Sequence, residues 1–225
     1  MLYLVSTPIG NYDDISRHTI DTLNSADFIF CEDTRETGKL LKYLEIKKPL
    51  ISFFEHNEEK KLDQVAQLIN GGKTIAMVSD RGTPSISDPG FRLVRKAIEN
   101  GIKFSIVPGP SAFLLALVYS GLPVHSFLFR GFPPRSSGKR RNFLDTDRTL
   151  PYTLIYYESP HRLIKFLQDA EAVFGNRSCC IANDLTKTYE KISRGKISNI
   201  ITEISEEKIR GEFTVVIAGY GYDKE

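Results

Sequence analysis

The sequence has few cysteines, no long apolar run and almost no net charge, and each shortage excludes a class of protein. Its three cysteines, Cys31, Cys179 and Cys180, form no CxxC pair and are too few for a disulfide framework, so we expect a reduced, cytoplasmic protein. No window holds about 18 uncharged apolar residues, which excludes a membrane-spanning helix. The first residues, MLYLVS, lack the regions of a secretory signal and predict an early strand instead.

Several familiar ligand-binding motifs are also missing. There is no GxGxxG, so a Rossmann nucleotide site has no support, and Gly72-Lys73-Thr74 lacks the first glycine that a phosphate-binding P-loop needs. Gly109-Pro110-Ser111 does not complete the GxSxG elbow of a serine hydrolase. The four histidines stand apart from one another and from the cysteines, so no bound metal is expected.

The composition and periodicity are those of a globular α/β protein. The 225 residues are 41% hydrophobic and 26% charged, close to the average for folded domains. Short apolar runs alternate with stretches of helical spacing, and strands separated by helices favour a mostly parallel sheet. We expect strands over residues 2–6, 27–31, 50–54, 74–78 and 103–107 in the first half, and over residues 126–132, 153–157, 179–182, 191–196 and 213–218 in the second.

A predicted domain boundary divides these strands into two groups. Gly121-Leu122-Pro123 closes a helix, and an irregular stretch with Pro133-Pro134 follows it. We therefore predict an N-terminal α/β domain over residues 1–121, which carries three loops rich in Gly and Pro, and a C-terminal mixed α/β domain over residues 122–225. The second domain would include a basic loop at residues 133–148.

The basic charge is concentrated in one segment. The net charge of the chain is +2, but residues 130–148 hold six Lys and Arg against two Asp. Such a cluster favours a polyanionic partner, because Lys and Arg contacts to phosphates release counterions, whereas the alternative is a solvated loop that aids solubility. If the partner is a polyanion, we expect this segment to be mobile without it and to contact its phosphates through Arg135, Lys139, Arg140 and Arg141.

Three loops are richer in Gly, Pro and small polar residues than turns require. They cover residues 6–11, 79–90 and 107–112, and each follows a predicted strand. In open α/β sheets, ligands bind beyond the carboxyl ends of strands, where such loops meet. Gly and Pro there allow close backbone approach and a fixed shape. The three loops together predict a binding cleft.

Three polar segments also follow predicted strands. The first, Cys-Glu-Asp-Thr-Arg at residues 31–35, contains two acids, a hydroxyl and an arginine, and Asp33 or Thr34 could equally cap the next helix. The second, residues 157–162, places Ser159 as a cap for a helix over residues 161–173. The third, residues 185–190, contains Lys187, which a solvated surface position would also explain.

Together these segments resemble the ribosomal RNA small subunit methyltransferase I family of the tetrapyrrole methylase superfamily. They run in the family's order along essentially the whole chain, and the SDxGTPxISDPG loop is highly specific. The resemblance implies two α/β domains of the tetrapyrrole methylase type, with S-adenosylmethionine in a ligand cleft between them, usually in a homodimer. The implied reaction is methyl transfer to the ribose 2′-hydroxyl of a cytidine in the decoding region of small-subunit rRNA.

The resemblance also implies which residues contact the cofactor. Pro8 and Gly10 would lie at the edge of the cleft, and Ser111 and Ala112 would lie under the ligand. The methionine part would be held by Ser79, Asp80, Gly82, Thr83 and Ile86. In the second domain, the residues near the adenosine would be Tyr157, Asn183 and Leu185.

The chain departs from the family pattern at three places. Arg81 stands where the family usually has a small residue, and Ser85 stands where it often has glycine. Asn183-Asp184 replaces the usual Arg-Glu before the Leu-Thr-Lys run. These departures affect the packing and charge of the loops.

A ribose hydroxyl is a weak nucleophile, so a base or a nearby cation should help it lose its proton. We expect Asp33, Arg35 and Lys187 to face the reacting ribose. The candidate bases are Asp33, Glu158 and Glu190, and the candidate cations are Arg35 and Lys187.

Three other functions stay open. The chain could methylate a tetrapyrrole or the diphthamide precursor, although the basic segment argues against both. It could be an RNA-binding protein without catalysis, or a small-molecule binding protein without an RNA partner. The glycines present in all three loops favour an intact cofactor site, which argues against an RNA-binding protein without catalysis.

Overall fold

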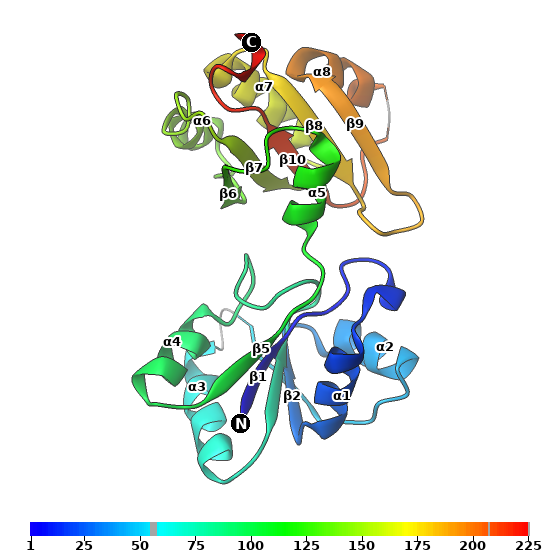
Figure 1. Cartoon of the computed structure of the whole chain (residues 1–225), viewed down its shortest axis with the longest axis vertical. Coiled ribbons are helices and arrows are strands. Elements are labelled where there is room, and N and C mark those ends of the chain that lie inside the picture. The colour runs from blue at the N-terminus through cyan, green and yellow to red at the C-terminus, as the bar shows by residue number, and fades with distance from the viewer. Residues whose placement is uncertain (55–57, 207, 225) are drawn as a thin grey trace. The chain divides into compact units, whose positions relative to one another are not determined.

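A computed structural model describes residues 1–54, 58–206 and 208–224. It consists of two compact units, Met1–Ser111 and Ala112–Glu225, each built on a five-stranded sheet (Figure 1). The predicted α/β class is confirmed. The units divide before the helix that precedes Gly121, whereas the sequence pattern places the boundary after it.

Unit 1 has a parallel sheet with the strand order β3-β2-β4-β1-β5. Its strands lie at the predicted positions, with small differences at their ends. The elements are β1 (Leu2–Val5), the 3-10 turn η1 (Tyr12–Asp14), α1 (Arg17–Ser25), β2 (Phe28–Cys31), α2 (Thr34–Tyr43), β3 (Leu50–Ser52), α3 (Glu58–Asn70), β4 (Ile75–Val78), α4 (Phe91–Glu99) and β5 (Phe104–Val107).

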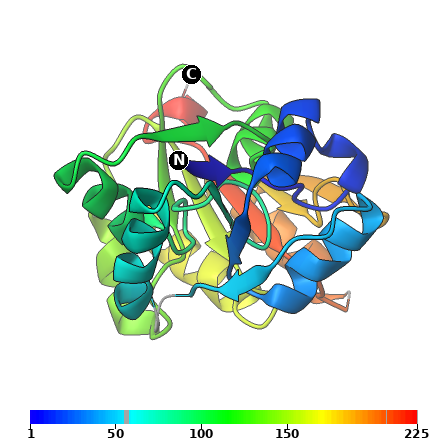
Figure 2. The ribbon, with the colours of Figure 1, turned by 90° about the horizontal axis from the view of Figure 1, so that it is seen from below.

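The unit 1 sheet is covered on both faces. Figures 1 and 2 show α3 and α4 on one side of the strands and α1 and α2 on the other. All four residues of β4 are buried, because this central strand lies between both helical layers. Continuous apolar strands of this kind are typical of parallel sheets that are covered on both faces. Since the strands are parallel, the loops that follow them meet at one edge.

Unit 2 begins with α5, and its sheet has the strand order β6-β7-β10-β8-β9. β6 and β7 are parallel, whereas β10 is antiparallel to β7 and β8, and β9 is antiparallel to β8. This is the predicted mixture of strand directions. The elements are α5 (Ala112–Ser120), β6 (Phe127–Gly131), α6 (Ser137–Asp145), β7 (Thr153–Glu158), α7 (Leu163–Phe174), β8 (Ser178–Asn183), β9 (Lys191–Lys196), α8 (Ile197–Ser205), β10 (Phe213–Ile217) and the 3-10 turn η2 (Tyr222–Lys224).

The position of α5 explains the division between the units. This helix has an almost wholly apolar sequence, AFLLALVYS, and packs on β7, β8 and β10. Helices α7 and α8 bury their apolar residues on the other face, where Tyr156 and Phe166 lie in the core of unit 2. A glycine-proline turn marks the end of a helix, but only packing shows to which sheet the helix belongs.

Two local predictions in unit 2 are wrong. The basic segment is not an irregular loop, because residues 137–145 form helix α6, which packs on α7. Helix α7 begins at Leu163 rather than at residue 161, with Arg162 as its N-cap. The Ser159 carbonyl accepts hydrogen bonds from the Arg162 and Leu163 amides, so residues 159–162 form a turn before the helix.

None of the helices within the described ranges is both long and apolar enough to cross a bilayer.

Candidate functional site

The three glycine- and proline-rich loops meet at the carboxyl edge of the unit 1 sheet. Thr7, after β1, exchanges backbone hydrogen bonds of 2.9 and 3.1 Å with Gly82, after β4. The hydroxyls of Ser6 and Thr83 lie 2.9 Å apart. The Ser6 amide donates to the Val107 carbonyl at 3.1 Å, which links the β1 loop to the β5 loop.

Two glycines permit this close approach. A Cβ atom on Gly109 would lie 2.6 Å from the Cβ of Ser6, so only glycine lets the β5 loop reach the β1 loop. Gly82 has a φ of +78°, in the left-handed region that glycine adopts at no steric cost. Backbone carbonyls and amides therefore line this edge, with Pro8 buried and Gly10 half-buried in the loop after β1.

The loop over residues 79–90 has a strained backbone. Ser85 and Ser87 have φ values of +76° and +63°, which non-glycine residues rarely adopt. The Ser85 amide donates to the Pro89 carbonyl at 3.1 Å, which closes the loop on itself. The Ser85 hydroxyl is buried and has no hydrogen-bond partner among the described residues. The positive φ explains why glycine suits this position in the family pattern.

Carboxylates gather at the same edge. The Oδ1 atom of Asp80 accepts a 3.0 Å hydrogen bond from the Asp33 amide, which joins the loops after β4 and β2. Burial and the neighbouring carboxylate Asp80 raise the pKa of Glu32. Burial, with a contribution from Glu32, raises the pKa of Asp88 to about 7, although a hydrogen bond from Ser79 acts against the shift. The edge therefore favours a cationic ligand, which would relieve the repulsion between these groups.

Asp33 and Arg35 form a pair at the start of α2. The Asp33 side chain caps this helix by accepting a 2.8 Å hydrogen bond from the Arg35 amide, as the capping alternative predicts. The Arg35 guanidinium lies 2.7 Å from the Asp33 carboxylate. Hydrogen bonds from Arg35 lower the pKa of Asp33 to about 2. Asp33 is therefore a weak proton acceptor, whereas Arg35 remains largely exposed.

The candidate residues of unit 2 also share one sheet edge. In the register of the sheet, Glu158 at the end of β7 pairs with Phe213, and Phe213 pairs with Asn183 at the end of β8. Asn183 in turn pairs with Lys191, the first residue of β9. The segments that follow β7 and β8 therefore leave the sheet from the same side, two strand spacings apart, or about 10 Å.

Lys187 lies in the β8–β9 connection and is held by two acids. Its Nζ atom is 2.6 Å from Asp184 and 2.9 Å from Glu212. The Asp184 amide donates to the Glu212 carbonyl at 3.0 Å, so the connection is also joined by its backbone to the segment before β10. The lysine is a positioned cation rather than a freely solvated one.

Three neighbouring candidates have structural partners. Glu190 accepts hydrogen bonds from the Thr186 amide at 2.6 Å and from the Tyr119 hydroxyl at 3.1 Å. The Asn183 amide group donates to the Arg210 carbonyl at 3.1 Å, and Leu185 is buried. The substituted Asn183-Asp184 pair thus stabilises the loop.

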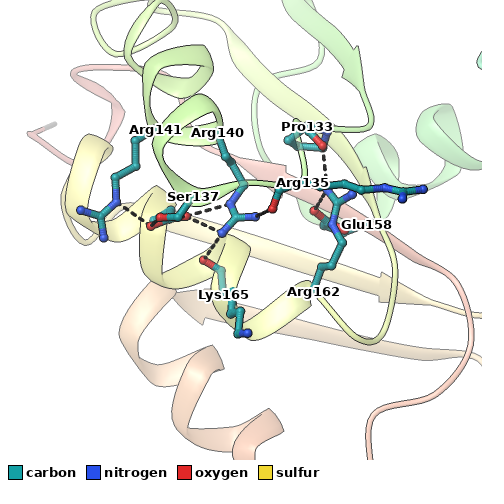
Figure 3. A network of polar contacts seen from close by, with 9 residues as sticks. Pro133, Arg135, Ser137, Arg140, Arg141, Glu158, Arg162 and Lys165 are labelled. Atoms are coloured by element: carbon teal, nitrogen blue, oxygen red, sulfur yellow. Dashed lines mark hydrogen bonds and ion pairs between the residues drawn. The ribbon is translucent and has the colours of Figure 1, made fainter.

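Glu158 is buried beneath Arg162. Its Oε1 atom is 2.5 Å from the guanidinium, which also donates to the Pro133 carbonyl at 2.6 Å (Figure 3). The other carboxylate oxygen accepts from the Ser159 amide at 2.7 Å. Because both oxygens are occupied by donors, Glu158 positions this turn and the chain before α6, and the structure supports it poorly as a base.

Tyr157 belongs to a group of aromatic side chains on the α5 face of the sheet. Its ring centroid lies 4.9 Å from that of Phe129 and 5.5 Å from that of Phe132. Phe129 stacks on Phe113 of α5 at 4.6 Å. Phe132 is exposed, so the group extends to the surface beside the start of the basic segment.

Two arginines of the basic segment form ion pairs within unit 2. Arg140 is only 3% exposed, and its guanidinium lies 2.5 Å from Asp169 of α7 (Figure 3). Arg141 approaches the same carboxylate at 2.6 Å but is 55% exposed. The expected phosphate contact of Arg140 conflicts with this burial, whereas Arg135 and Lys139 are exposed. The segment is anchored rather than free, so the expected mobility is not supported by its contacts.

Glu32, Asp88 and Ser6 also lie at the carboxyl edge of the unit 1 sheet, although the sequence pattern does not single them out as site residues. All three occur in the loops and polar segments described above, and Asp88 belongs to the SDxGTPxISDPG loop. Their contribution depends on burial and on contacts between loops, which spacing alone does not reveal. Ser111 ends unit 1, Ala112 begins α5, and Ile86 is 45% exposed.

Comparison with known proteins identifies the family. A model of the Tetrapyrrole (Corrin/Porphyrin) Methylases matches residues 1–201. The chain belongs to the tetrapyrrole methylase family. It is 46% identical, over 98% of its length and 76% of the relative's, to a protein of Halalkalibacterium halodurans named ribosomal RNA small subunit methyltransferase I. A Thermotoga maritima protein of the same name is 43% identical over 97% of this chain and 98% of its own.

Solved structures show the same tetrapyrrole methylase fold. Uroporphyrin-III-C-methyltransferase from Thermus thermophilus has a TM-score of 0.66 at 19% identity and covers 96% of this chain and 93% of its own. Diphthine synthase has a TM-score of 0.76 at 14% identity, over 96% of this chain and 89% of its own. These similarities concern the fold, whereas the relatives at 41–46% identity share one name.

Among the described residues of this tetrapyrrole methylase, no group of three or more His, Cys, Asp or Glu side chains is placed to hold a metal ion.

Proposed function

We propose that this tetrapyrrole methylase uses S-adenosylmethionine to methylate the ribose 2′-hydroxyl of a cytidine in the decoding region of small-subunit rRNA. The observation that carries the proposal is the 46% identity over almost the whole chain to a ribosomal RNA small subunit methyltransferase I. The 14–19% identity to the tetrapyrrole and diphthine enzymes supports a shared fold and gives no reason to transfer their substrates.

The residues at the unit 1 edge fit the proposed cofactor. S-adenosylmethionine carries two cationic groups, an ammonium and a sulfonium, and the edge offers half-buried carboxyl groups with raised pKa values. The buried Ser85 hydroxyl lacks a partner among the described residues and could donate to a ligand. Gly82 and Gly109 let the loop backbones approach closely, so their carbonyls and amides can surround a small molecule.

We assign the roles of the loops accordingly. Ser79, Asp80, Gly82, Thr83 and Ile86 would hold the methionine part, with Pro8, Gly10, Ser111 and Ala112 lining the site. In unit 2, Tyr157 offers an aromatic surface to the adenosine. Asn183 and Leu185 would contribute mainly through the backbone, because the Asn183 side chain donates within unit 2 and Leu185 is buried.

The chemistry of methyl transfer makes positioning and charge the main tasks of the protein. The cofactor supplies an electrophilic methyl group, and the ribose hydroxyl must lose its proton as the new C–O bond forms. Orientation of the reactants supplies about 7–11 kcal/mol in favourable cases. We propose that Arg35 and Lys187 provide positive charge beside the ribose or an adjacent phosphate, and that Asp33 orients Arg35.

The central experiment measures both cofactor and substrate. The purified protein should bind S-adenosylmethionine in calorimetry and should transfer a labelled methyl group to small subunits from cells that lack this modification. The product should be a 2′-O-methylcytidine. Label that enters a uroporphyrinogen-type tetrapyrrole and no RNA would overturn the proposal, as would the absence of any binding heat with the cofactor.

A second experiment tests the residue roles. We expect Lys187→Ala and Asp33→Asn to reduce turnover on rRNA by at least about tenfold, because each change removes or misplaces charge near the reacting group. Lys187→Arg should retain part of the activity, and Lys165→Ala, at an exposed position of α7, is the matched control. Unchanged turnover in both variants would show that the assignment is wrong.

We also propose that RNA phosphates are contacted by Arg135 and Lys139, with Arg141 contributing its exposed side. These positions are exposed on or just before α6, which Arg140 anchors on α7 through Asp169. The helix would thus present charge from a fixed support rather than from a mobile loop.

A homodimer and a cytoplasmic location complete the proposal. The family resemblance implies the dimer, and α5 exposes Leu114 and Val118, one helical turn apart, as an apolar surface that a second copy could cover. Light scattering should give a dimer mass that Val118→Asp reduces to that of a monomer. A monomeric wild-type protein would contradict this part. The location follows from the proposed substrate.

A further inference from the structure

Tyr189 is the most exposed of the large apolar side chains that the structure describes, with 84% of its surface accessible. It lies at the tip of the β8–β9 connection, in a two-residue turn with Thr188. Hairpin tips usually hold Gly, Asn, Asp or Ser, because those residues suit the turn backbone. Neither the turn nor the core of unit 2 therefore requires a tyrosine at this position.

The connection that carries Tyr189 is held firmly on both sides of the tip. On one side, the Lys187 amide donates to the Asp184 carbonyl at 3.0 Å, and the Lys187 side chain is paired with Asp184 and Glu212. On the other side, the Glu190 amide donates to the Lys187 carbonyl at 3.1 Å. The Glu190 carboxylate also accepts a hydrogen bond from the Tyr119 hydroxyl of α5.

Two backbone conformations add to this constraint. Asp184 and Thr186 have φ values of +48° and +65°, which are unfavourable for residues other than glycine. Such conformations persist only where surrounding contacts impose them. An exposed aromatic ring on a constrained connection loses little additional entropy when it binds a ligand, which is the condition for an effective contact residue.

The surroundings of the ring suit a nucleic acid. Lys187 precedes it by two residues, and Lys191 and Arg194 follow on β9. The two lysines are paired with Asp184, Glu212 and Glu203, whereas Arg194 places an exposed cation beside the tip. Proteins that recognise single-stranded RNA combine cations for the phosphates with aromatic rings on which unstacked bases lie.

We propose that Tyr189 is a substrate-positioning residue whose ring stacks on a base of single-stranded RNA next to the methylated nucleotide. The proposal rests on the proposed rRNA methylation and adds the element that reads the RNA, namely the tip of the β8–β9 connection (Figure 1). Stacking holds a base without selecting its identity, so Tyr189 fixes the position of the strand, while other contacts select the nucleotide.

The sequence offers a direct probe, because it contains no tryptophan. Tyr189→Trp places a single indole at the tip and keeps an aromatic face. A short single-stranded RNA copied from the decoding region should quench the fluorescence of this variant, whereas the same sequence in a perfect duplex or inorganic phosphate should not. Tyr152→Trp is the matched control, because Tyr152 is also exposed but precedes β7, at the opposite end of the strand from Glu158.

Activity measurements on conservative variants complete the test. Tyr189→Leu keeps an apolar side chain but removes the aromatic face, and we expect it to raise the KM for small subunits roughly tenfold with a smaller change in kcat. Tyr189→Phe should retain near wild-type kinetics, since it keeps the ring. Affinity for S-adenosylmethionine should not change in either variant, which separates a positioning effect from damage to the cofactor site.

The possible results separate this inference from the proposed function. If the wild-type protein methylates rRNA while RNA leaves the fluorescence of the Tyr189→Trp variant unchanged and Tyr189→Leu has a normal KM, the inference fails and the function stands. If the wild-type protein does not methylate rRNA, the proposed function itself fails. If the indole is shielded from a soluble quencher without RNA, in a manner that depends on protein concentration, Tyr189 lies in an interface between copies and the inference is wrong.

Discussion

The two units of the molecule hold desolvated carboxyl groups in different ways. At the edge of unit 1, Glu32, Asp80 and Asp88 lie near one another, and burial raises their pKa values. In unit 2, Glu158 is buried against Arg162, and Asp169 against Arg140. The first arrangement gathers partly buried carboxyl groups beside one another, and the second pairs each fully buried carboxylate with an arginine.

This difference separates a ligand site from a support. Neighbouring carboxylates that are partly desolvated repel one another, so the unit 1 edge has free energy to gain from a cation. A buried ion pair has no such gain, and its loss exposes a desolvated charge. We therefore infer that the unit 1 edge binds the cationic cofactor, and that the paired residues of unit 2 hold its RNA-facing segments in place.

The largest expected effect comes from breaking a pair in unit 2. Arg140→Ala leaves Asp169 as a buried charge without its main partner and should lower the free energy of unfolding by about 3–5 kcal/mol. Arg141→Ala, at the exposed end of the same network, should cost less than about 1 kcal/mol. Urea denaturation followed by circular dichroism measures both. Equal effects would show that burial does not distinguish the two arginines.

Next in size is the effect of filling the space between two loops of unit 1. The Cβ atom of Gly109→Ala would lie 2.6 Å from Ser6, so the β1 and β5 loops must separate. Displacement of about 1 Å in a binding site can cost roughly a hundredfold, and we expect S-adenosylmethionine affinity to fall by about that factor in calorimetry. Gly138→Ala is the control, because nothing lies within 4 Å of its Cβ position. Unaltered affinity in Gly109→Ala would place the cofactor elsewhere.

A smaller effect should appear in the pH dependence of stability. The pKa of Asp88 is raised to about 7 in the folded protein, so the folded state retains a proton that the unfolded state has lost. This contribution is fully present below the unfolded pKa of 3.8 and is lost as the pH rises from about 4 to the folded value of about 7, above which both states are ionised. Thermal melting across this range should show the loss in the wild type but not in Asp88→Asn.

Asp169 should behave in the opposite sense. Burial acts to raise its pKa, but hydrogen bonds from Arg141, Arg140 and Ser137 outweigh burial and lower it. Its contribution is therefore present above the unfolded pKa of 3.8 and is lost as the pH falls through the lower folded value. Melting curves recorded from about pH 5 down to about pH 3 should show this loss of stability in the wild type and no such loss in Asp169→Asn. A loss on raising the pH instead would contradict the contrast between the two edges.

The smallest expected effect concerns the exposed cations of the basic segment. Replacing Arg135 and Lys139 with Gln should weaken RNA binding modestly and reduce the slope of log affinity against log salt by about one for each phosphate that the protein no longer neutralises. Lys42→Gln, at an exposed position of unit 1, should leave the slope unchanged. The same slope in both variants would mean that α6 does not bind phosphates.

The strands, the Asp33 cap and the binding loops could be predicted because local physics sets them. Apolar runs form buried strands, Asp33 accepts from the Arg35 amide two residues ahead, and Gly-Pro-rich turns follow strands. The burial of Arg140 against Asp169 could not be predicted in this way. Its partner Asp169 is 29 residues away, and no charge count shows that one arginine in a basic run is buried while its neighbour is exposed.

The sequence by itself determined the α/β class, the order of the strands along the chain and the family to which the protein belongs, because all three depend on residues read in linear order. Only the tertiary structure decided which sheet holds α5, which arginines remain exposed and which carboxylates lie beside one another. The reason is that burial and electrostatic coupling depend on distances between segments far apart in the chain, and these distances arise only when the sheets form.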